Sequence, residues 1–291
     1  MKSVLVILSS LLLLGCTKAG ITIANLPAKL SSHTIVKNQA YGEQNQQKLD
    51  IFIPEQIEGD ITESRPVVVF FYGGRWTDGS KEMYAFIGQK LANQGYIAVI
   101  ADYRKYPNVK FPTFVEDGAK AIAWTYRHIS QYGGDPKQLF VSGHSSGAHI
   151  GALITADESY LGAENLSPNI ISAFAGLAGP YDFVPKAPDL KDMFGPPENF
   201  KNMVVSHFID GTEPPMLLMW GDEDEAVWRR NIDLLTEKIL KKQGRVKRII
   251  YPDVDHVGII SGLTWFLPKK APVINDINAF FKQYKKPKSS A

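Results

Sequence analysis

The sequence is poor in two features that often point directly to a function, cysteine and clustered charge. Cys16 is the only cysteine among 291 residues, so no intramolecular disulfide can form. The 32 basic and 30 acidic side chains give a net charge of +2, and no basic cluster is large enough to indicate a nucleic-acid partner. The hydrophobic fraction of 44% is ample for a sizeable core, and the length suits one large α/β domain.

Long hydrophobic runs are also missing. The apolar stretch 4–14 is too short to span a bilayer as a helix, and with Lys2 before it the stretch is typical of a signal peptide. It ends in Leu13-Leu14-Gly15-Cys16, which resembles a bacterial lipobox, whose cysteine is diacylated and becomes the new N-terminus.

This resemblance implies a signal peptide at 1–15, lipidation of Cys16 and a polar tether at 16–32. We therefore expect a protein of the bacterial cell envelope, lipid-anchored at the outer membrane and facing the periplasm or the cell surface. The alternative is an ordinary secretory signal with a coincidental cysteine.

Apolar runs and helical patterns alternate along the rest of the chain. The runs are almost continuously apolar, as in strands that are buried on both faces of a parallel sheet. Strands are predicted at 48–53, 66–71, 97–102, 138–142, 171–177, 216–220 and 246–251, and helices at 81–93, 114–130, 148–156, 227–243 and 273–284. This order predicts one α/β domain at 33–291, with a mostly parallel sheet covered by helices on both faces.

One long stretch, 181–215, interrupts the alternation. It is rich in proline and aromatic residues, and it leaves a strand end at the edge of the sheet where ligands bind in open α/β folds. We expect it to form a small cap over the active site. Trp76, Tyr181 and Phe183 are the candidates for lining the substrate pocket.

The motif Gly143-His144-Ser145-Ser146-Gly147 lies between a predicted strand and a predicted helix. In that context G-x-S-x-G is typical of a nucleophile elbow, where a tight turn lifts the serine hydroxyl clear of the sheet. Glycine is needed two residues before and after the serine because flanking side chains would collide. The alternative is an ordinary glycine-rich turn whose hydroxyl only caps the helix.

A serine nucleophile needs a base and an acid that orients the base. His256 is the expected base, because it alone among six histidines follows a late strand from which a loop can reach the sheet edge. The acid is expected in the loop after strand 216–220, which contains four acidic residues, Asp222 to Glu225. The residues alone leave these four open.

Backbone N–H groups should stabilise the oxyanion. One comes from Ser146, directly after the nucleophile, and others from the loop after strand 66–71, where Gly74 and Arg75 lie. The Gly73-Gly74 pair lets this backbone approach a substrate closely.

Together these motifs resemble the α/β-hydrolases of the esterase/lipase superfamily, from about residue 45 to the last helix. The chain is most similar to small carboxylesterases with an H-G-G-x-W motif, a group that also includes hormone-sensitive-lipase-like, feruloyl-esterase-like and kynurenine-formamidase-like enzymes. Trp76-Thr77-Asp78-Gly79 matches the W-x-x-G that follows that motif. Gly221, Asp224 and Val227 match the family pattern G-x-x-D-x-x-V, so the resemblance singles out Asp224 as the acid.

The chain departs from the family at Tyr72, which replaces the leading histidine. We expect its hydroxyl to brace the oxyanion loop; the alternative is that the ring only packs in the core. The resemblance implies a serine esterase with a small-molecule ester substrate, no cofactor and no metal. Amide or formamide hydrolysis, as in arylformamidases, and a non-catalytic binding role are the alternatives, and the oligomeric state is left open.

Overall fold

The computed structural model describes residues 20, 22–26, 33–55, 64–265, 267 and 271–285. The predicted signal peptide and Cys16 therefore lie outside the described residues. Part of the predicted tether is described: residues 22–24 form a helical turn, and the Asn25 side chain binds the backbone of Glu82, Met83 and Phe86. No helix within the described ranges is long and apolar enough to cross a membrane.

The core is one eight-stranded sheet in the order β1-β2-β4-β3-β5-β6-β7-β8. β1 and β2 pair antiparallel, as do β2 and β4, and every other neighbouring pair is parallel. The strands are β1 (Thr34–Ala40), β2 (Lys48–Ile53), β3 (Arg65–Phe71), β4 (Ile97–Ala101), β5 (Gly134–His144), β6 (Ile171–Leu177), β7 (Met216–Gly221) and β8 (Val246–Tyr251). The predicted α/β fold with a mostly parallel sheet is confirmed.

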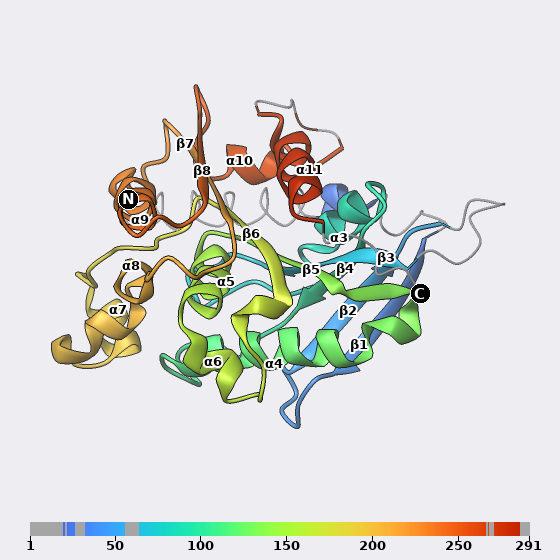
Figure 1. Cartoon of the computed structure of the whole chain (residues 1–291), viewed down its shortest axis with the longest axis horizontal. Coiled ribbons are helices and arrows are strands. Elements are labelled where there is room, and N and C mark those ends of the chain that lie inside the picture. The colour runs from blue at the N-terminus through green and yellow to red at the C-terminus, as the bar shows by residue number, and fades with distance from the viewer. Residues whose placement is uncertain are drawn as a thin grey trace, which may run out of the picture.

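Helices cover both faces of this sheet. α3 and α11 lie on one face, and α4 and α6 lie on the other (Figure 1). The α-helices are α3 (Ala85–Ala92), α4 (Thr113–His128), α5 (Ser146–Ala156), α6 (Glu158–Gly162), α7 (Pro188–Phe194), α8 (Val205–Phe208), α9 (Arg230–Lys241), α10 (Gly258–Ser261) and α11 (Val273–Gln283). Short 3₁₀ helices are η1 (Ile129–Tyr132), η2 (Pro168–Ile170) and η3 (Pro197–Met203). Because both faces are covered, every residue of β4 and β6 is buried.

The turn between β5 and α5 is tight. Ser145 has a φ of 54°, in the left-handed region that costs a non-glycine residue free energy. A Cβ on Gly143 would lie 2.6 Å from the Gly147 carbonyl, and a Cβ on Gly147 would lie 2.1 Å from the Phe71 carbonyl oxygen. Both flanking positions therefore require glycine, as the elbow motif predicts.

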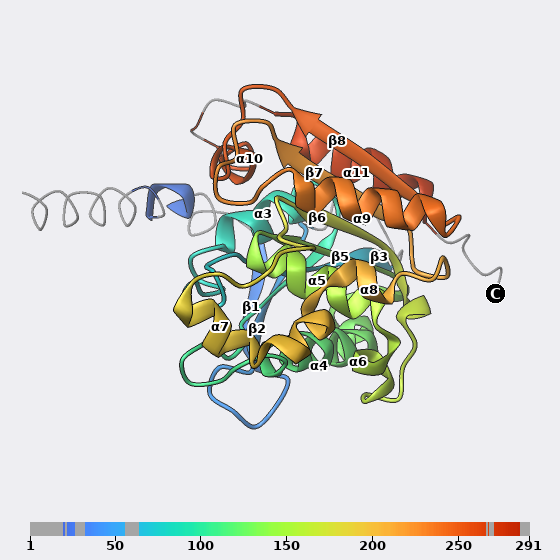
Figure 2. The ribbon, with the colours of Figure 1, turned by 90° about the vertical axis from the view of Figure 1, so that its left-hand side faces the viewer.

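Some elements differ from the sequence prediction. The strand β1 is absent from it, and the helix predicted at 227–243 begins only at Arg230. The spacing of Trp228, Ile232, Leu235 and Ile239 predicts that Trp228 lies on the buried face of that helix, but Trp228 precedes the helix and is 63% exposed. Residues 181–215 contain α7, η3 and α8; α8 packs against α5 and α9, and η3 joins it to α7 (Figure 2).

Candidate active site

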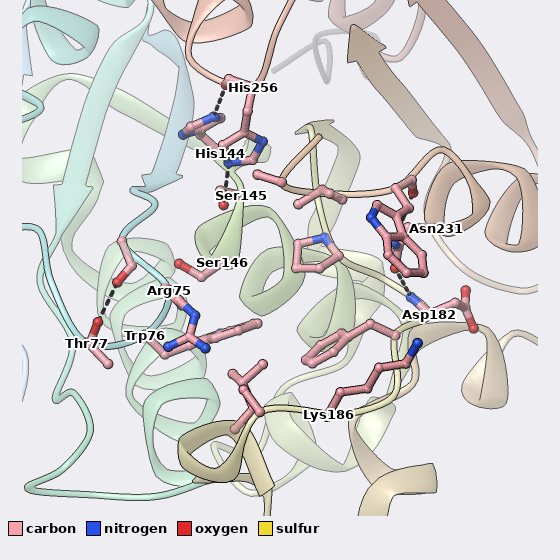
Figure 3. Close-up of a pocket in the computed structure, with 18 of the residues that line it drawn as sticks. Arg75, Trp76, Thr77, His144, Ser145, Ser146, Asp182, Lys186, Asn231 and His256 are labelled. Carbon is pink, nitrogen blue, oxygen red and sulfur yellow. Dashed lines mark hydrogen bonds between the residues drawn. The ribbon is translucent and has the colours of Figure 1, made fainter. Parts of the chain in front are cut away.

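Three side chains from different strand ends meet in one hydrogen-bonded chain. Ser145 lies at the elbow after β5, Asp224 in the loop after β7 and His256 in the loop after β8. His256 Nε2 is 2.9 Å from Ser145 Oγ (Figure 3), and His256 Nδ1 is 2.8 Å from Asp224 Oδ2. The three strands run parallel, so their carboxyl ends share one sheet edge, and this brings residues far apart in sequence together.

Asp224 is the acidic residue of its loop that contacts His256. Its carboxylate is buried, and Oδ1 accepts hydrogen bonds from the backbone N–H groups of Ala226 (2.9 Å) and Val227 (2.8 Å). Those donors fix the carboxylate so that Oδ2 faces His256. Asp222 instead accepts from the backbone N–H of Asp253 at 2.8 Å.

His144, the variable residue before the serine, holds the loop of His256. Its buried ring donates from Nε2 to the main-chain carbonyl of His256 at 3.1 Å, whereas its Nδ1 is buried without a hydrogen-bond partner. Burial, reinforced by the neighbouring His256, lowers the pKa of His144 to about 3, so the ring stays neutral. The only signal in the sequence for this role of His144 is its position inside the elbow motif.

The loop after β3 runs directly beside the serine. A Cβ on Gly73 would lie 3.0 Å from Ser145 Cβ, and a Cβ on Gly74 would lie 2.2 Å from the Asp78 carbonyl oxygen. Arg75 and Trp76 have positive φ values of 54° and 60°, so two consecutive non-glycine residues are held in the left-handed region. Backbone strain of this kind is concentrated at functional sites.

The structure brings all three residues expected at the oxyanion hole to one cavity. Gly74, Arg75 and Ser146 line it together with Ser145 and His256. The N–H groups in the first turn of α5 have no acceptor within the helix, so that end of α5 can stabilise negative charge.

The Tyr72 hydroxyl does not brace the oxyanion loop by a direct hydrogen bond, which was the expected contact. This buried hydroxyl donates to Asp102 Oδ1 at 2.6 Å and accepts from Lys105 Nζ at 3.0 Å. Asp102 Oδ1 also accepts from the backbone N–H of Lys81 at 2.8 Å. The hydroxyl therefore reaches the far end of the loop through Asp102. Burial raises the pKa of Tyr72 and of Asp102 and lowers that of Lys105.

The cavity has a volume of about 870 Å³ and opens beside Ser145. Trp76 and Phe183 form part of its wall, with stacked rings whose centroids are 5.6 Å apart. Tyr181, the third residue expected to line it, does not: its side chain is buried, and a Cβ on Gly176 would lie 2.0 Å from its hydroxyl.

The helix α7 forms another part of the wall and is tied to the oxyanion loop. Arg75 forms an ion pair with Asp189 of α7, in which the second guanidinium nitrogen is 3.2 Å from Asp189 Oδ1. Asp192, one turn later, binds the Lys110 ammonium at 2.5 Å. Charged contacts thus tie α7 to the oxyanion loop and to Lys110.

The described residues contain no group of three or more His, Cys, Asp or Glu side chains arranged to hold a metal ion.

A protein family and several known proteins are similar to this chain in sequence. Residues 49–239 match the family model BD-FAE. A probable isoprenylcysteine alpha-carbonyl methylesterase of Arabidopsis thaliana is 27% identical over 75% of the chain and 50% of its own length. Esterase LipC of Mycobacterium tuberculosis is 28% identical over 63% of the chain and 50% of its own length.

The fold has close counterparts among solved structures. A carbohydrate esterase from gut microbiota superposes with a TM-score of 0.74 at 19% identity, over 86% of this chain and 96% of that one. The chain spans about half the length of the two curated relatives described above.

Proposed function

Because the chain belongs to the BD-FAE family, we propose that it is a serine hydrolase that cleaves carboxylic esters of small molecules through an acyl-enzyme on Ser145. The observation that carries the proposal is the hydrogen-bonded chain from Ser145 Oγ through His256 to the buried Asp224, at the mouth of a cavity large enough for a small ester. The curated relatives named above are esterases, which supports ester chemistry in particular.

The proposed reaction runs through Ser145, His256 and Asp224. Ser145 Oγ attacks the ester carbonyl while His256 Nε2 takes its proton, and the imidazolium is held by Asp224. When the C–O bond breaks, His256 returns that proton to the leaving alcohol. A water molecule then attacks the acyl-enzyme with His256 again as base, and the free acid and Ser145 are released.

Negative charge builds on the carbonyl oxygen in both steps. We assign its stabilisation to backbone N–H groups of Gly74, Arg75 and Ser146, which border the same space as the nucleophile. The positive φ values at Arg75 and Trp76 support this role, because backbone strain of this kind persists only where surrounding contacts hold the loop in place, and it is concentrated at functional sites.

The test is a panel of p-nitrophenyl esters of increasing acyl length, assayed beside a formamide and a feruloyl ester. We expect ester turnover that falls by about 10⁴-fold or more in Ser145→Ala, because the nucleophile is lost while the fold remains. A fluorophosphonate probe should label the wild type and not the variant. Stoichiometric labelling of Ser145→Ala would place the nucleophile elsewhere, and faster cleavage of the formamide would favour an amidase.

We also propose that the mature protein is anchored to a bacterial envelope membrane by a lipidated Cys16, on the basis of the lipobox-like sequence. Cys16→Ser should leave the membrane fraction or stay as an uncleaved precursor. Normal membrane fractionation of a processed Cys16→Ser protein would contradict the proposal.

A further inference from the structure

Cationic side chains and an exposed tryptophan lie at the end of the cavity away from Ser145. Lys186, Asp182 and Asn231 lie on the side opposite Ser145 and Ser146 (Figure 3). Trp228 and Arg230 line the same cavity. This end, which we call the distal subsite (Lys186, Trp228 and Arg230), takes no part in the proposed ester chemistry.

Trp228 is presented to solvent by its own backbone contacts. Its carbonyl accepts from the Asn231 backbone N–H at 2.9 Å and from the Asn231 side chain at 3.0 Å, which fixes the turn before α9. The indole is left 63% exposed, and Lys186 Nζ lies 5.0 Å from its ring centroid. A large exposed aromatic ring beside a cavity is a common element of binding sites, because it supplies contact area with little loss of side-chain freedom.

The two cations of the distal subsite differ from the third cation of the cavity. Arg75 is neutralised by Asp189. Neither Lys186 nor Arg230 forms an ion pair with any of the described residues.

The carboxyl group of Asp182 in the cavity wall forms no ion pair with either cation. Asp182 Oδ1 accepts a hydrogen bond from the Ser206 hydroxyl, and the Asp182 backbone N–H donates to Asn231 at 2.9 Å. Burial raises the pKa of Asp182 to about 6, opposed by the Ser206 hydrogen bond and the charge of Arg230. Arg230 acts on this carboxyl only at longer range than an ion pair, so Lys186 and Arg230 both remain available to pair with the charge of a ligand.

We propose that the distal subsite binds a carboxylate carried by the substrate, on a planar or hydrocarbon part that packs against Trp228. The inference rests on the proposed ester hydrolysis at Ser145 and adds the substrate class: esters in which the acid or the alcohol part bears a second, anionic group. A flat ring beside two cations can recognise such a group by stacking and charge at once.

Two matched substrate pairs test the inference and show which part of the ester carries the charge. For the alcohol part, 4-acetoxybenzoate is compared with neutral 4-acetoxybenzamide. For the acyl part, the mono-4-nitrophenyl ester of adipate is compared with 4-nitrophenyl hexanoate. The readout is the ratio of kcat/KM for the charged ester to that for the neutral one, within each variant.

We expect Lys186→Gln combined with Arg230→Gln to lower this ratio by about three- to tenfold for at least one pair, as for partly exposed ion pairs. Added salt should lower the wild-type ratio in the same direction. Lys191→Gln, which removes an exposed α7 lysine that does not line the cavity, should leave the ratio unchanged. An equal ratio in wild type and double variant for both pairs would overturn the inference.

Binding to Ser145→Ala separates this result from failure of the proposed function. Calorimetry should detect 4-acetoxybenzoate more strongly than 4-acetoxybenzamide, and the difference should vanish when Lys186 and Arg230 are replaced. If the wild type cleaves no ester but this difference persists, the subsite stands and the proposed reaction falls. If esters are cleaved but neither turnover nor binding depends on the two cations, the subsite is refuted alone.

Discussion

The contact between His144 and the main chain of His256 leads to a specific expectation about catalysis. His144→Met replaces the imidazole ring by an unbranched side chain of similar length and removes the Nε2–H donor. The carbonyl of His256 then loses its 3.1 Å partner while the side chain of His256 keeps its bonds to Ser145 and Asp224. The base should therefore remain in the site but sample more positions.

The size of the effect follows from the worth of one neutral hydrogen bond. Such a bond contributes about 1 kcal/mol net, and a buried carbonyl left without a donor costs about 1–3 kcal/mol. If about 1 kcal/mol of this free energy separates the productive loop position from others, the productive population and kcat fall by about fivefold, and a larger share of it would lower them further. KM should change little, because the carbonyl of His256 faces His144.

The assay is steady-state turnover of a short p-nitrophenyl ester by three proteins: wild type, His144→Met and His144→Gln. Glutamine can place an amide N–H near the former Nε2, so it should recover most of kcat if the donor matters. Equal losses in both variants would show that His144 acts only through packing. Wild-type kcat in His144→Met would refute the positioning role altogether.

Three further expectations follow from the site. Asp224→Asn should lower kcat by about 10⁴-fold, whereas Asp222→Asn should stay near wild type, since Asp222 binds only the backbone of Asp253; equal losses would indicate a general charge effect. Tyr72→Phe should cost about 2 kcal/mol of stability, seen as a lower Tm, with less than about tenfold loss of kcat; a hundredfold loss at unchanged Tm would restore direct bracing of the oxyanion loop. Burial lowers the pKa of His149 from 6.5 to about 4, so as the pH falls the unfolded chain takes up a proton on this ring before the folded chain does. The stability that the neutral ring contributes above pH 6.5 is therefore lost as the pH falls towards 4. In His149→Gln, the free energy of unfolding from urea titrations should therefore fall less steeply with decreasing pH, by the slope that corresponds to about one bound proton. An unchanged slope would show that His149 is not responsible.

The part of the site that could be predicted from the sequence depends on local geometry. The elbow at Ser145 is short-range, because two glycines and a serine are all that the turn needs. His256 could be selected by its place after the last strand. Among the four acidic residues of the β7 loop, only the resemblance pointed to Asp224. The structure supplies the physical reason, since Ala226 and Val227 donate to its carboxylate.

What could not be predicted depends on contacts between distant segments. Helical periodicity placed Trp228 on a buried face, but the turn held by Asn231 delays the start of α9 and leaves the ring outside. Tyr181 is an aromatic residue of the kind that often lines a pocket, yet its ring packs towards the glycines of β6 and the following turn. The His144 contact exists only because the β8 loop crosses over the end of β5. No local pattern encodes these arrangements.

The placement of segment 181–215 has a consequence for how the chain can be altered. The segment supplies Phe183, Lys186 and Leu190 to the cavity wall but none of the three hydrogen-bonded side chains, which all follow other strands. Its ends enter from β6 and leave into β7, two adjacent strands of one rigid sheet. One part of the cavity wall is thus carried by a stretch of polypeptide separate from the reactive groups. A chimera that exchanges this stretch for that of a relative, with Asp189 retained to meet Arg75, would transplant that part of the substrate preference onto an unchanged reaction centre.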